Sequence, residues 1–214
     1  MRILKTITVM TLIALMHCHA YNLVEKLENP GGGPQIPRKI FVHPTSVTGS
    51  MGSFITVAGC AGSAGIAAAD CACRAQATAA GLANSNKFIA WLSDNTNDAI
   101  CRVQGMTGSG CAINSNSAWY NTKGDLVAGG LADLKSGLKA AVLYTDAGMT
   151  TVATQIFTGT TAAGIKSASN CLNWTSVTGT DVATSGSPTV SGPGWTEGGT
   201  VGCTSAYIYC IESQ

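Results

Sequence analysis

The number and placement of nine cysteines constrain this chain of 214 residues more than any other feature. Cys18 lies in an apolar N-terminal segment, and eight more cysteines follow it, at positions 60, 71, 73, 101, 111, 171, 203 and 210. An even number of cysteines behind an export segment is typical of a disulfide framework, whereas a reduced cytosolic protein would carry scattered free thiols. We therefore predict an exported domain that is stapled by disulfide bonds.

Residues 1–20 have the parts of a secretory signal. Arg2 and Lys5 form a charged start, and the largely apolar run from Ile7 to Met16 is too short to span a bilayer as a helix. The sequence therefore predicts export, with removal of this segment.

Two cleavage sites remain open in this segment. The stretch Leu15-Met16-His17-Cys18 resembles a bacterial lipobox, which would make Cys18 the lipidated N-terminal residue. The alternative is cleavage after Ala20 by ordinary signal peptidase, which would give a secreted protein. We favour lipidation at Cys18, because a Leu stands three positions before the Cys directly after the apolar run. Acyl chains on that residue would anchor the protein stably to a membrane.

The rest of the chain divides into a tether and one domain. Residues 21–38 are expected to form a flexible tether, because the run Asn29-Pro30-Gly31-Gly32-Gly33-Pro34 interrupts any regular structure. The folded domain is expected to cover residues 39–214, with no internal repeat and no second domain.

Charge is sparse in this sequence. Only 11% of the residues are charged, 45% are hydrophobic and 26 residues are glycine, a composition that suits short strands joined by small-residue loops. Removal of Arg2 and Lys5 with the signal leaves 10 basic against 11 acidic residues, a net charge of −1. No basic field remains to gather nucleic acid or anionic lipid, so we exclude nucleic-acid binding.

The clearest helix signal covers residues 67–80 and ends before Gly81. Cys71 and Cys73 are two residues apart, so they point to nearly opposite sides of this helix. They therefore favour two separate disulfides over a Cys-x-Cys metal site. A second helix is expected over 125–138, interrupted at Gly129 and Gly130.

The clearest strand signal lies at the end of the chain. Ala206, Ile208 and Cys210 alternate with Ser205, Tyr207 and Tyr209, which predicts a strand with one face on a core. Other strands are expected at 39–42, 88–92, 140–144 and 152–158, with another beginning at 119–120; residues 54–57 are expected as either strand or loop. Residues 159–202 are expected to be mostly loop, with Trp174 and Trp195 as anchors.

Two ordered blocks of residues resemble collagen-derived endostatin. The run Gly65-Ile66-Ala67-Ala68-Ala69-Asp70-Cys71-Ala72-Cys73, with the stretches 79–82 and 88–93, resembles its first helix and following strand. Cys171-Leu172-Asn173-Trp174 and Cys203-x-x-x-Tyr207-Ile208-x-Cys210-Ile211-Glu212 resemble its C-terminal end. With the lipobox-like leader, the chain is similar to the leptospiral endostatin-like surface lipoproteins over about residues 39–214.

The resemblance implies a fold and part of the disulfide pattern. The fold would be α+β, a single C-type-lectin-like domain with helices around twisted sheets. The implied pairs are Cys73 with Cys210 and Cys171 with Cys203. For the remaining cysteines the neighbouring pairs are favoured, Cys60–Cys71 and Cys101–Cys111, although four cysteines allow three connectivities.

The resemblance also implies a function. The protein would be an adhesin on the outer membrane and cell surface, not an enzyme, with no cofactor. Its partners would be host proteins, namely complement factor H and related regulators, fibronectin, laminin and plasminogen. Candidate contact residues are the aromatics Trp119, Tyr120 and Trp195, because aromatic residues dominate binding hot spots, although they would serve equally well as core anchors. Lys135 and Lys139 are the candidates for plasminogen kringles.

Several features of related proteins are missing from this sequence. Only three arginines follow the leader, Arg38, Arg74 and Arg102, so endostatin-like heparin binding is not expected. His43 and His19 are too few histidines for a zinc site, so no metal is expected. The triplets Glu-Pro-Asn and Gln-Pro-Asp of calcium-dependent lectins are absent.

Known catalytic motifs are also missing. There is no Gly-x-Ser-x-Gly elbow and no phosphate loop, and the neighbours Asn95 and Asn97 make Asp94 and Asp98 a solvated turn. Two alternatives to the adhesin remain. The first is a secreted carbohydrate-binding or hydrolytic protein on the same fold, which predicts a polar pocket with convergent carboxylates. The second is a structural envelope lipoprotein.

Overall fold

The last strand of the chain, β8 (Tyr207–Glu212), lies at the centre of a mixed sheet. It pairs along one edge with β1 (Arg38–Val42), antiparallel. Along its other edge β2 (Phe88–Ala90) pairs antiparallel with its C-terminal half, and β5 (Ile156–Phe157) pairs parallel with its N-terminal half. The C-terminal strand therefore ties together segments from the beginning and the middle of the chain.

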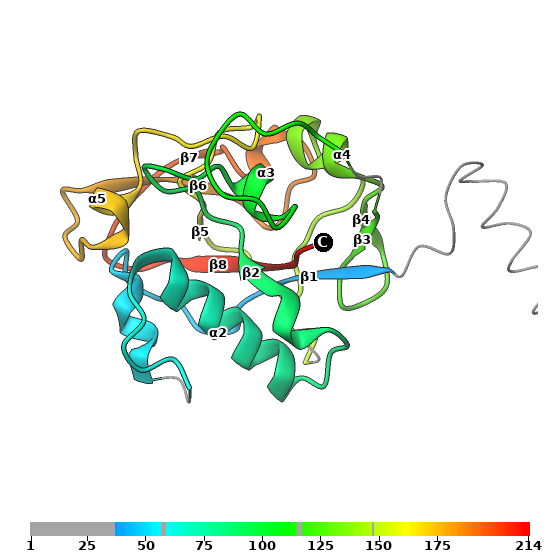
Figure 1. Ribbon diagram of the computed structural model, residues 1–214, viewed down its shortest axis with the longest axis horizontal. Coiled ribbons are helices and arrows are strands. Elements are labelled where there is room, and N and C mark those ends of the chain that lie inside the picture. The colour runs from blue at the N-terminus through cyan, green and yellow to red at the C-terminus, as the bar shows by residue number, and fades with distance from the viewer. Residues whose placement is uncertain (1–36, 57–58, 115–116, 147) are drawn as a thin grey trace, which may run out of the picture. The chain divides into compact units, whose positions relative to one another are not determined.

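The structure is a computed structural model that describes residues 37–56, 59–114, 117–146 and 148–214. Residues from Pro37 to Gln214 form one folded unit (Figure 1). The predicted signal at 1–20, all but the last two residues of the predicted tether at 21–38, and Cys18 lie outside the described residues. Within the described part of the chain, no helix has the length and apolar character that crossing a membrane requires.

The sheet continues on both sides of the central strands. Its order is β4-β3-β1-β8-β5-β6-β7, so β4 and β7 form the edges. The remaining strands are β3 (Trp119–Tyr120), β4 (Leu126–Ala128), β6 (Val182–Gly186) and β7 (Gly199–Gly202). The helices are η1 (Met51–Thr56), α2 (Gly65–Ala79), η2 (Ser85–Lys87), α3 (Ala99–Arg102), α4 (Leu131–Ser136), α5 (Cys171–Trp174) and η3 (Pro193–Trp195).

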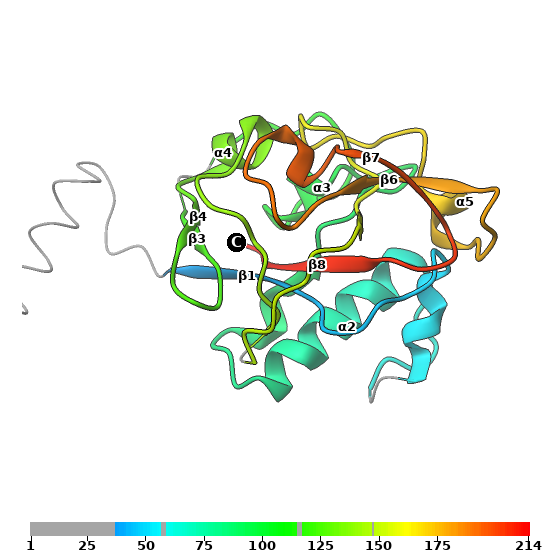
Figure 2. The ribbon, with the colours of Figure 1, turned by 180° about the vertical axis from the view of Figure 1, so that it is seen from behind.

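Both faces of β8 are buried, which corrects the prediction of a strand with only one face on a core. Ile208 and Cys210 belong to the core on the α2 side, and Tyr209 and Ile211 belong to the core on the opposite side. Tyr209 is accommodated inside because its hydroxyl donates to the carbonyl of Trp195 at 2.9 Å. Figures 1 and 2 show α2 on one side of β8, and α3 and α4 on the other.

Helix α2 packs closely against the sheet because its inner face consists of small residues. Ala68, Ala69, Ala72, Cys73 and Ala77 are buried. The helix begins two residues before the predicted start at residue 67 and ends one residue before the predicted end at residue 80. Gly81 follows it with φ of +66°, a left-handed conformation that glycine adopts without strain.

Four disulfide bonds hold the unit together. They join Cys73 to Cys210, Cys171 to Cys203, Cys60 to Cys71 and Cys101 to Cys111. The first two are the pairs that the resemblance implies, and the other two are the neighbouring pairs that were favoured among three possible connectivities. Cys73–Cys210 links α2 to β8 across 137 residues, so it fixes the helix on the central strand.

Some predicted elements are wrong. Residues 125–138 form β4 followed by α4 instead of one helix, because extended Gly130 separates them. Residues 140–144 form no strand and make only an isolated bridge between Tyr144 and Thr151. Strands β6 and β7 occupy part of the predicted loop 159–202; their Gly, Ser and Thr residues carry little of the apolar alternation that identifies a strand. Helix α3 was not predicted, and residues 51–56 form the 3-10 helix η1.

Candidate functional site

The most unusual backbone in the described chain is α5, a short left-handed turn. The φ angles of Cys171, Leu172, Asn173 and Trp174 are 53°, 54°, 59° and 63°. For a residue with a side chain this conformation costs about 1–2 kcal/mol, and it normally occurs at single positions. Strain of this kind persists where the surroundings impose it, and it is concentrated at functional sites.

Contacts with distant parts of the chain impose this conformation. The disulfide to Cys203 holds the first residue, and the indole Nε1 of Trp174 donates to the carbonyl of Ser93 at 2.8 Å. The side chain of Asn170 accepts from the backbone N–H of Asn173 at 2.9 Å. Gly159 packs so tightly on Trp174 that an added Cβ would lie 2.6 Å from the ring. The turn is therefore held at both ends.

The turn presents an apolar side chain to solvent. Leu172 is 65% exposed, more than any other large hydrophobic residue that the structure describes. Val177 is 54% exposed and Val182 is 39% exposed. We call residues 171–182 the apolar tip; it lies at the left-hand end of the folded unit in Figure 1. No charged residue occurs between 167 and 180, so most of the tip is uncharged.

A cleft of about 540 Å³ lies beside the turn. Its walls come from the start of α2, the loop after β2, the segment after α3, and α5. The polar side chains among its lining residues include Asp70, Asp94, Asn97, Arg102, Thr107 and Asn173. This volume lies within the range of small-ligand sites, 300–1,000 Å³.

Arg102 and Asp70 form an ion pair in the cleft. Nη2 of Arg102 lies 2.6 Å from each carboxylate oxygen of Asp70, and the two side chains are only 10% and 17% exposed. Nη1 of Arg102 donates to the carbonyls of Ala90 and Leu92, both at 2.8 Å, and Asp70 accepts from the N–H of Ala90 at 2.9 Å. The pair therefore joins α2, β2 and α3, and the charges of both side chains are satisfied.

Asp94 is the second carboxylate in the cleft. Its Oδ1 accepts from the backbone N–H groups of Thr96 and Asn97, both at 2.7 Å, and from the side chains of both. Among the described residues, its Oδ2 accepts only from Nδ2 of Asn97, at 3.1 Å. Partial burial would raise the pKa of Asp94, but the hydrogen bonds from Thr96 and Asn97 outweigh it, and the pKa lies below 3.8. Asp94 is therefore ionised at neutral pH.

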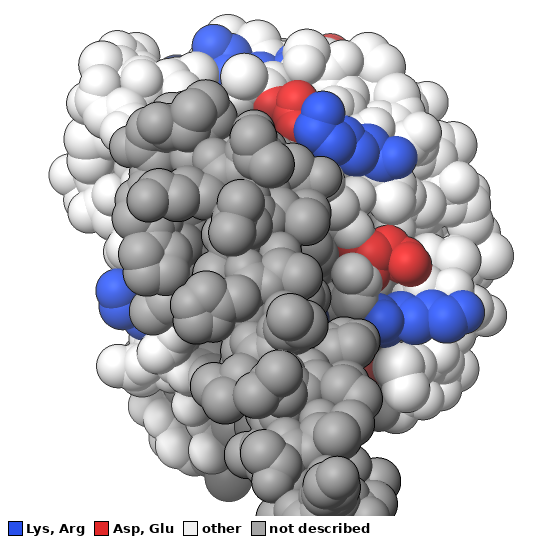
Figure 3. Space-filling model, turned by 90° about the vertical axis from the view of Figure 1, so that its right-hand side faces the viewer, with Lys and Arg blue, Asp and Glu red and all other residues white. Residues whose placement is uncertain are grey.

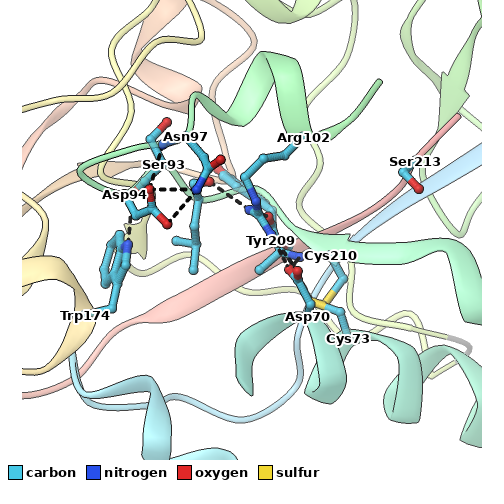
Figure 4. A network of polar contacts seen from close by, with 12 residues as sticks. Asp70, Cys73, Ser93, Asp94, Asn97, Arg102, Trp174, Tyr209, Cys210 and Ser213 are labelled. Carbon is cyan, nitrogen blue, oxygen red and sulfur yellow. Dashed lines mark hydrogen bonds and ion pairs between the residues drawn. A yellow bond between two sulfur atoms is a disulfide. The ribbon is translucent and has the colours of Figure 1, made fainter. Parts of the chain in front are cut away.

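Figure 4 shows how these residues lie relative to one another. Trp174 points toward Ser93 at one end of the network, beside Asp94 and Asn97. At the other end Arg102 reaches Asp70, near the disulfide between Cys73 and Cys210. The left-handed turn α5, the cleft and the disulfide Cys73–Cys210 therefore form one connected region.

Asp98 does not join Asp94 in the cleft. It is 2% exposed, and its carboxylate accepts from the backbone N–H groups of Lys166 at 2.8 Å and Gly110 at 3.0 Å. Asp98 therefore holds loops together, which corrects its assignment to a solvated turn. Asp94 does lie in a polar loop, as the flanking asparagines predicted.

The predicted aromatic contact residues Trp119 and Trp195 are wrong as exposed binding residues. Both are fully buried. Nε1 of Trp119 donates to the carbonyl of Glu212 at 2.8 Å, and Trp195 packs on Trp91 with ring centroids 5.0 Å apart. Tryptophan side chains bury a large apolar area, and this chain has few aromatic residues. Its tryptophans therefore pack in the core. Tyr120 is partly buried.

The candidate lysines lie on the surface. Lys135 and Lys139 are exposed, and Nζ of Lys139 lies 3.4 Å from the carboxylate of Asp133. On the face shown in Figure 3, outside the grey atoms, basic side chains are few, and some of them lie next to acidic ones. That face offers no extended basic patch, in keeping with the scarcity of arginine in the sequence.

His43 is buried and packs edge-on against Phe54, with ring centroids 5.1 Å apart. Burial lowers the pKa of His43 below 6.5, although a hydrogen bond with Thr45 and the charge of Asp146 act in the opposite direction. Among the residues that the structure describes, no group of three His, Cys, Asp or Glu side chains is placed to hold a metal.

Sequence reasoning missed Leu172 and the cleft. The one available signal for the turn was an apolar residue flanked by asparagines at 170 and 173, since asparagine tolerates the left-handed conformation. Comparison with known proteins adds no assignment, because no family model and no curated protein matches this sequence.

Proposed function

We propose that this protein is a surface adhesin of the endostatin-like class, with a C-type-lectin-like domain anchored through a lipid on Cys18. Its partners are host proteins of the extracellular matrix and plasma, namely fibronectin, laminin, plasminogen, and factor H with related complement regulators. The proposal is supported by the sequence resemblance and by the disulfides Cys73–Cys210 and Cys171–Cys203, the two pairs that the resemblance implies.

One observation carries the proposal, the exposure of Leu172 on a strained turn. A leucine side chain that is 65% exposed gains little from burial, and its left-handed backbone costs stability. Asparagine or glycine would adopt that backbone at lower cost. A leucine at this position is therefore best explained by contact with a partner.

The apolar tip has the properties of a preorganised contact surface. Its backbone is held by a disulfide and by the Trp174 hydrogen bond, so little conformational entropy is lost on binding. The segment 167–180 carries no charge, so salt should weaken binding through it little, and Leu172 and Val177 supply its exposed apolar area.

The experiment replaces Leu172 by asparagine, which suits the left-handed conformation but removes the apolar side chain. Binding of the full native protein to immobilised fibronectin, laminin, factor H and plasminogen is measured by surface plasmon resonance. We expect at least one of these partners to lose about tenfold or more in affinity. Unchanged affinity of Leu172→Asn for every partner that the native protein binds, or no binding by the native protein itself, would contradict the proposal.

Met149 supplies a matched control. It is 48% exposed and also has a left-handed backbone, with φ of 49°, but it lies outside the apolar tip. Met149→Asn makes the same chemical change in a similar backbone, and we expect it to leave binding unchanged.

The hydrolytic alternative is weakened by the state of the two cleft carboxylates. Asp70 is engaged on both oxygens by Arg102, which leaves only Asp94 with an open oxygen. A glycosidase needs two carboxylates that each act on the substrate.

A structural envelope role is the second alternative. It is favoured if protease added to intact cells fails to reach the protein.

A further inference from the structure

The cleft beside α5 has features that the proposed adhesive function does not use. Asp94 is fixed in place by Thr96 and Asn97, yet within the described part of the chain its Oδ2 makes only one hydrogen bond, at 3.1 Å. No basic side chain forms an ion pair with it among the described residues, where the only ion pairs are Arg102–Asp70 and Lys139–Asp133. The cleft therefore holds an ionised acceptor that is in position before any ligand arrives.

Hydrogen-bond donors line the same cleft. The side-chain nitrogen of Asn173 donates to no other described residue, and its side-chain oxygen accepts from the backbone N–H of Asn95. At the start of α2, the N–H groups of Ile66 and Ala67 have no partner in the described chain, because Ala64 offers no capping side chain. Open donors thus accompany the open acceptor.

The charge and the apolar area of the cleft lining further restrict the class of ligand that it can bind. Arg102 neutralises Asp70, so the lining carries a net charge of −1, at Asp94. This charge disfavours an anion, and the unpartnered N–H groups disfavour a cation. Ile66, Ile89 and Met106 supply apolar contact area beside the polar groups. The ligand that suits this lining is neutral, carries groups that both donate and accept, and has an apolar side.

We propose that the cleft binds a neutral polyhydroxylated ligand, a saccharide of one or two pyranose rings. A hydroxyl group donates one hydrogen bond and accepts others, so adjacent ring hydroxyls would donate to Oδ2 of Asp94 and accept from the amide of Asn173. The C–H side of the ring would lie on Ile66, Ile89 and Met106. The Leu172 side chain does not line the cleft, although Asn173 beside it on α5 does, and the binding uses no metal.

The test begins with an array of neutral mono- and disaccharides, probed with the full native protein in buffer that contains EDTA. The saccharide with the strongest signal is then titrated by calorimetry. We expect binding that persists in EDTA, at millimolar to micromolar dissociation constants. If no saccharide binds, or if EDTA abolishes binding, the proposal is overturned.

Two variants locate the binding. Asp94→Asn keeps an oxygen for Thr96 and Asn97 but converts the open acceptor into a donor, so affinity should fall about tenfold or more, the effect of losing a hydrogen bond to a charged group. Ala67→Phe, at an exposed position of α2, would fill the cleft without touching the contacts of Asp94, and should abolish binding. If Asp94→Asn does not fold, Ala67→Phe alone tests whether the saccharide binds in the cleft. Saccharide binding that survives the occluding Phe would overturn the proposal.

Asp181 is the matched control. Like Asp94 it accepts hydrogen bonds from neighbouring hydroxyls, of Ser176 and Thr178, but it does not line the cleft. Asp181→Asn should leave saccharide binding unchanged, and equal losses in both Asn variants would contradict the site.

Nα-acetyl-lysine amide serves as a cationic probe of the same cleft. If it binds through Asp94 and the saccharides do not, the saccharide proposal is overturned and the cleft binds cationic side chains instead. Leu172→Asn should leave saccharide binding intact, so the adhesive and saccharide proposals fail separately.

Discussion

The guanidinium of Arg102 contacts both carboxylate oxygens of Asp70 at 2.6 Å and donates to the carbonyls of Ala90 and Leu92. The two residues are 32 positions apart in the sequence, on α3 and α2. Their contact joins α2 and α3 to the end of β2, and it forms part of the cleft. A single pair of charges therefore supports both the fold and the candidate saccharide site.

Replacing Arg102 by alanine should destabilise the protein by about 3 kcal/mol, because it leaves the carboxylate of Asp70 buried without its partner. Urea unfolding followed by circular dichroism measures this change. Arg74→Ala on the same helix as Asp70 is the control; Arg74 has no ion pair among the described residues, so the loss should stay within about 0.5 kcal/mol. Equal losses in the two variants would refute the role of the pair.

Replacing Leu172 by asparagine should raise stability by about 1 kcal/mol, because asparagine relieves left-handed strain and little burial is lost. The free energy of unfolding in urea measures the gain. Combined with the loss of partner binding expected above, it would show that the leucine is retained at a cost in stability. A clear loss of stability would show instead that Leu172 supports the fold.

The pH dependence of stability should reflect His43. Because burial lowers the pKa of folded His43 below 6.5, the unfolded chain takes up the proton first as the pH falls. The contribution of neutral His43 is therefore complete above pH 6.5 and is lost as the pH drops from there through the folded pKa. Unfolding free energies between pH 7.5 and 5 measure the slope.

His43→Gln should flatten that slope. Asp94 and Asp181 do not interfere, because the pKa of each lies below 3.8 and their titration falls outside this range. An unchanged slope in the Gln variant would assign the pH dependence to another group.

The two kinds of disulfide should differ in their effect on stability. Loss of Cys73–Cys210, which closes 137 residues, should cost about 5 kcal/mol in the chain-entropy model, and loss of Cys101–Cys111, which closes 10, about 3 kcal/mol. Thermal unfolding of the two double-alanine variants compares them. The reverse order would show that local packing, rather than chain entropy, governs these cross-links.

Local features of the sequence predicted much of the scaffold. The spacing of small residues predicted α2 to within two residues at each end, and apolar runs predicted β1 and β2. The disulfide pairs were expected partly from resemblance and partly from the opposite orientations of Cys71 and Cys73. The signals for α2, β1 and β2 reside in neighbouring residues, whereas the distant pairs Cys73–Cys210 and Cys171–Cys203 were expected only from the resemblance.

Features that depend on distant contacts were not predicted. The alternation around Tyr209 indicated one buried face, but the carbonyl of Trp195 satisfies its hydroxyl and allows burial on both. Trp119 was equally suited to a contact surface or a core, and only the packing of β3 decided between them. The cleft joins segments that lie far apart in the chain, and no local pattern marks such a meeting point.

By itself, the amino-acid sequence determined a chain poor in charge, the position of helix α2, and eight cysteines after the N-terminal apolar segment that can form four disulfide bonds. The tertiary structure alone decided that Leu172 lies exposed on a left-handed turn and that Asp94 keeps an open oxygen in a cleft. The physical reason is that distant contacts impose the strained backbone at Leu172. Cys203 bonds to Cys171 across 32 residues, and Ser93 accepts a hydrogen bond from Trp174 across 81 residues. The local sequence around Leu172 disfavours a left-handed backbone, so that conformation cannot be predicted from the neighbouring residues.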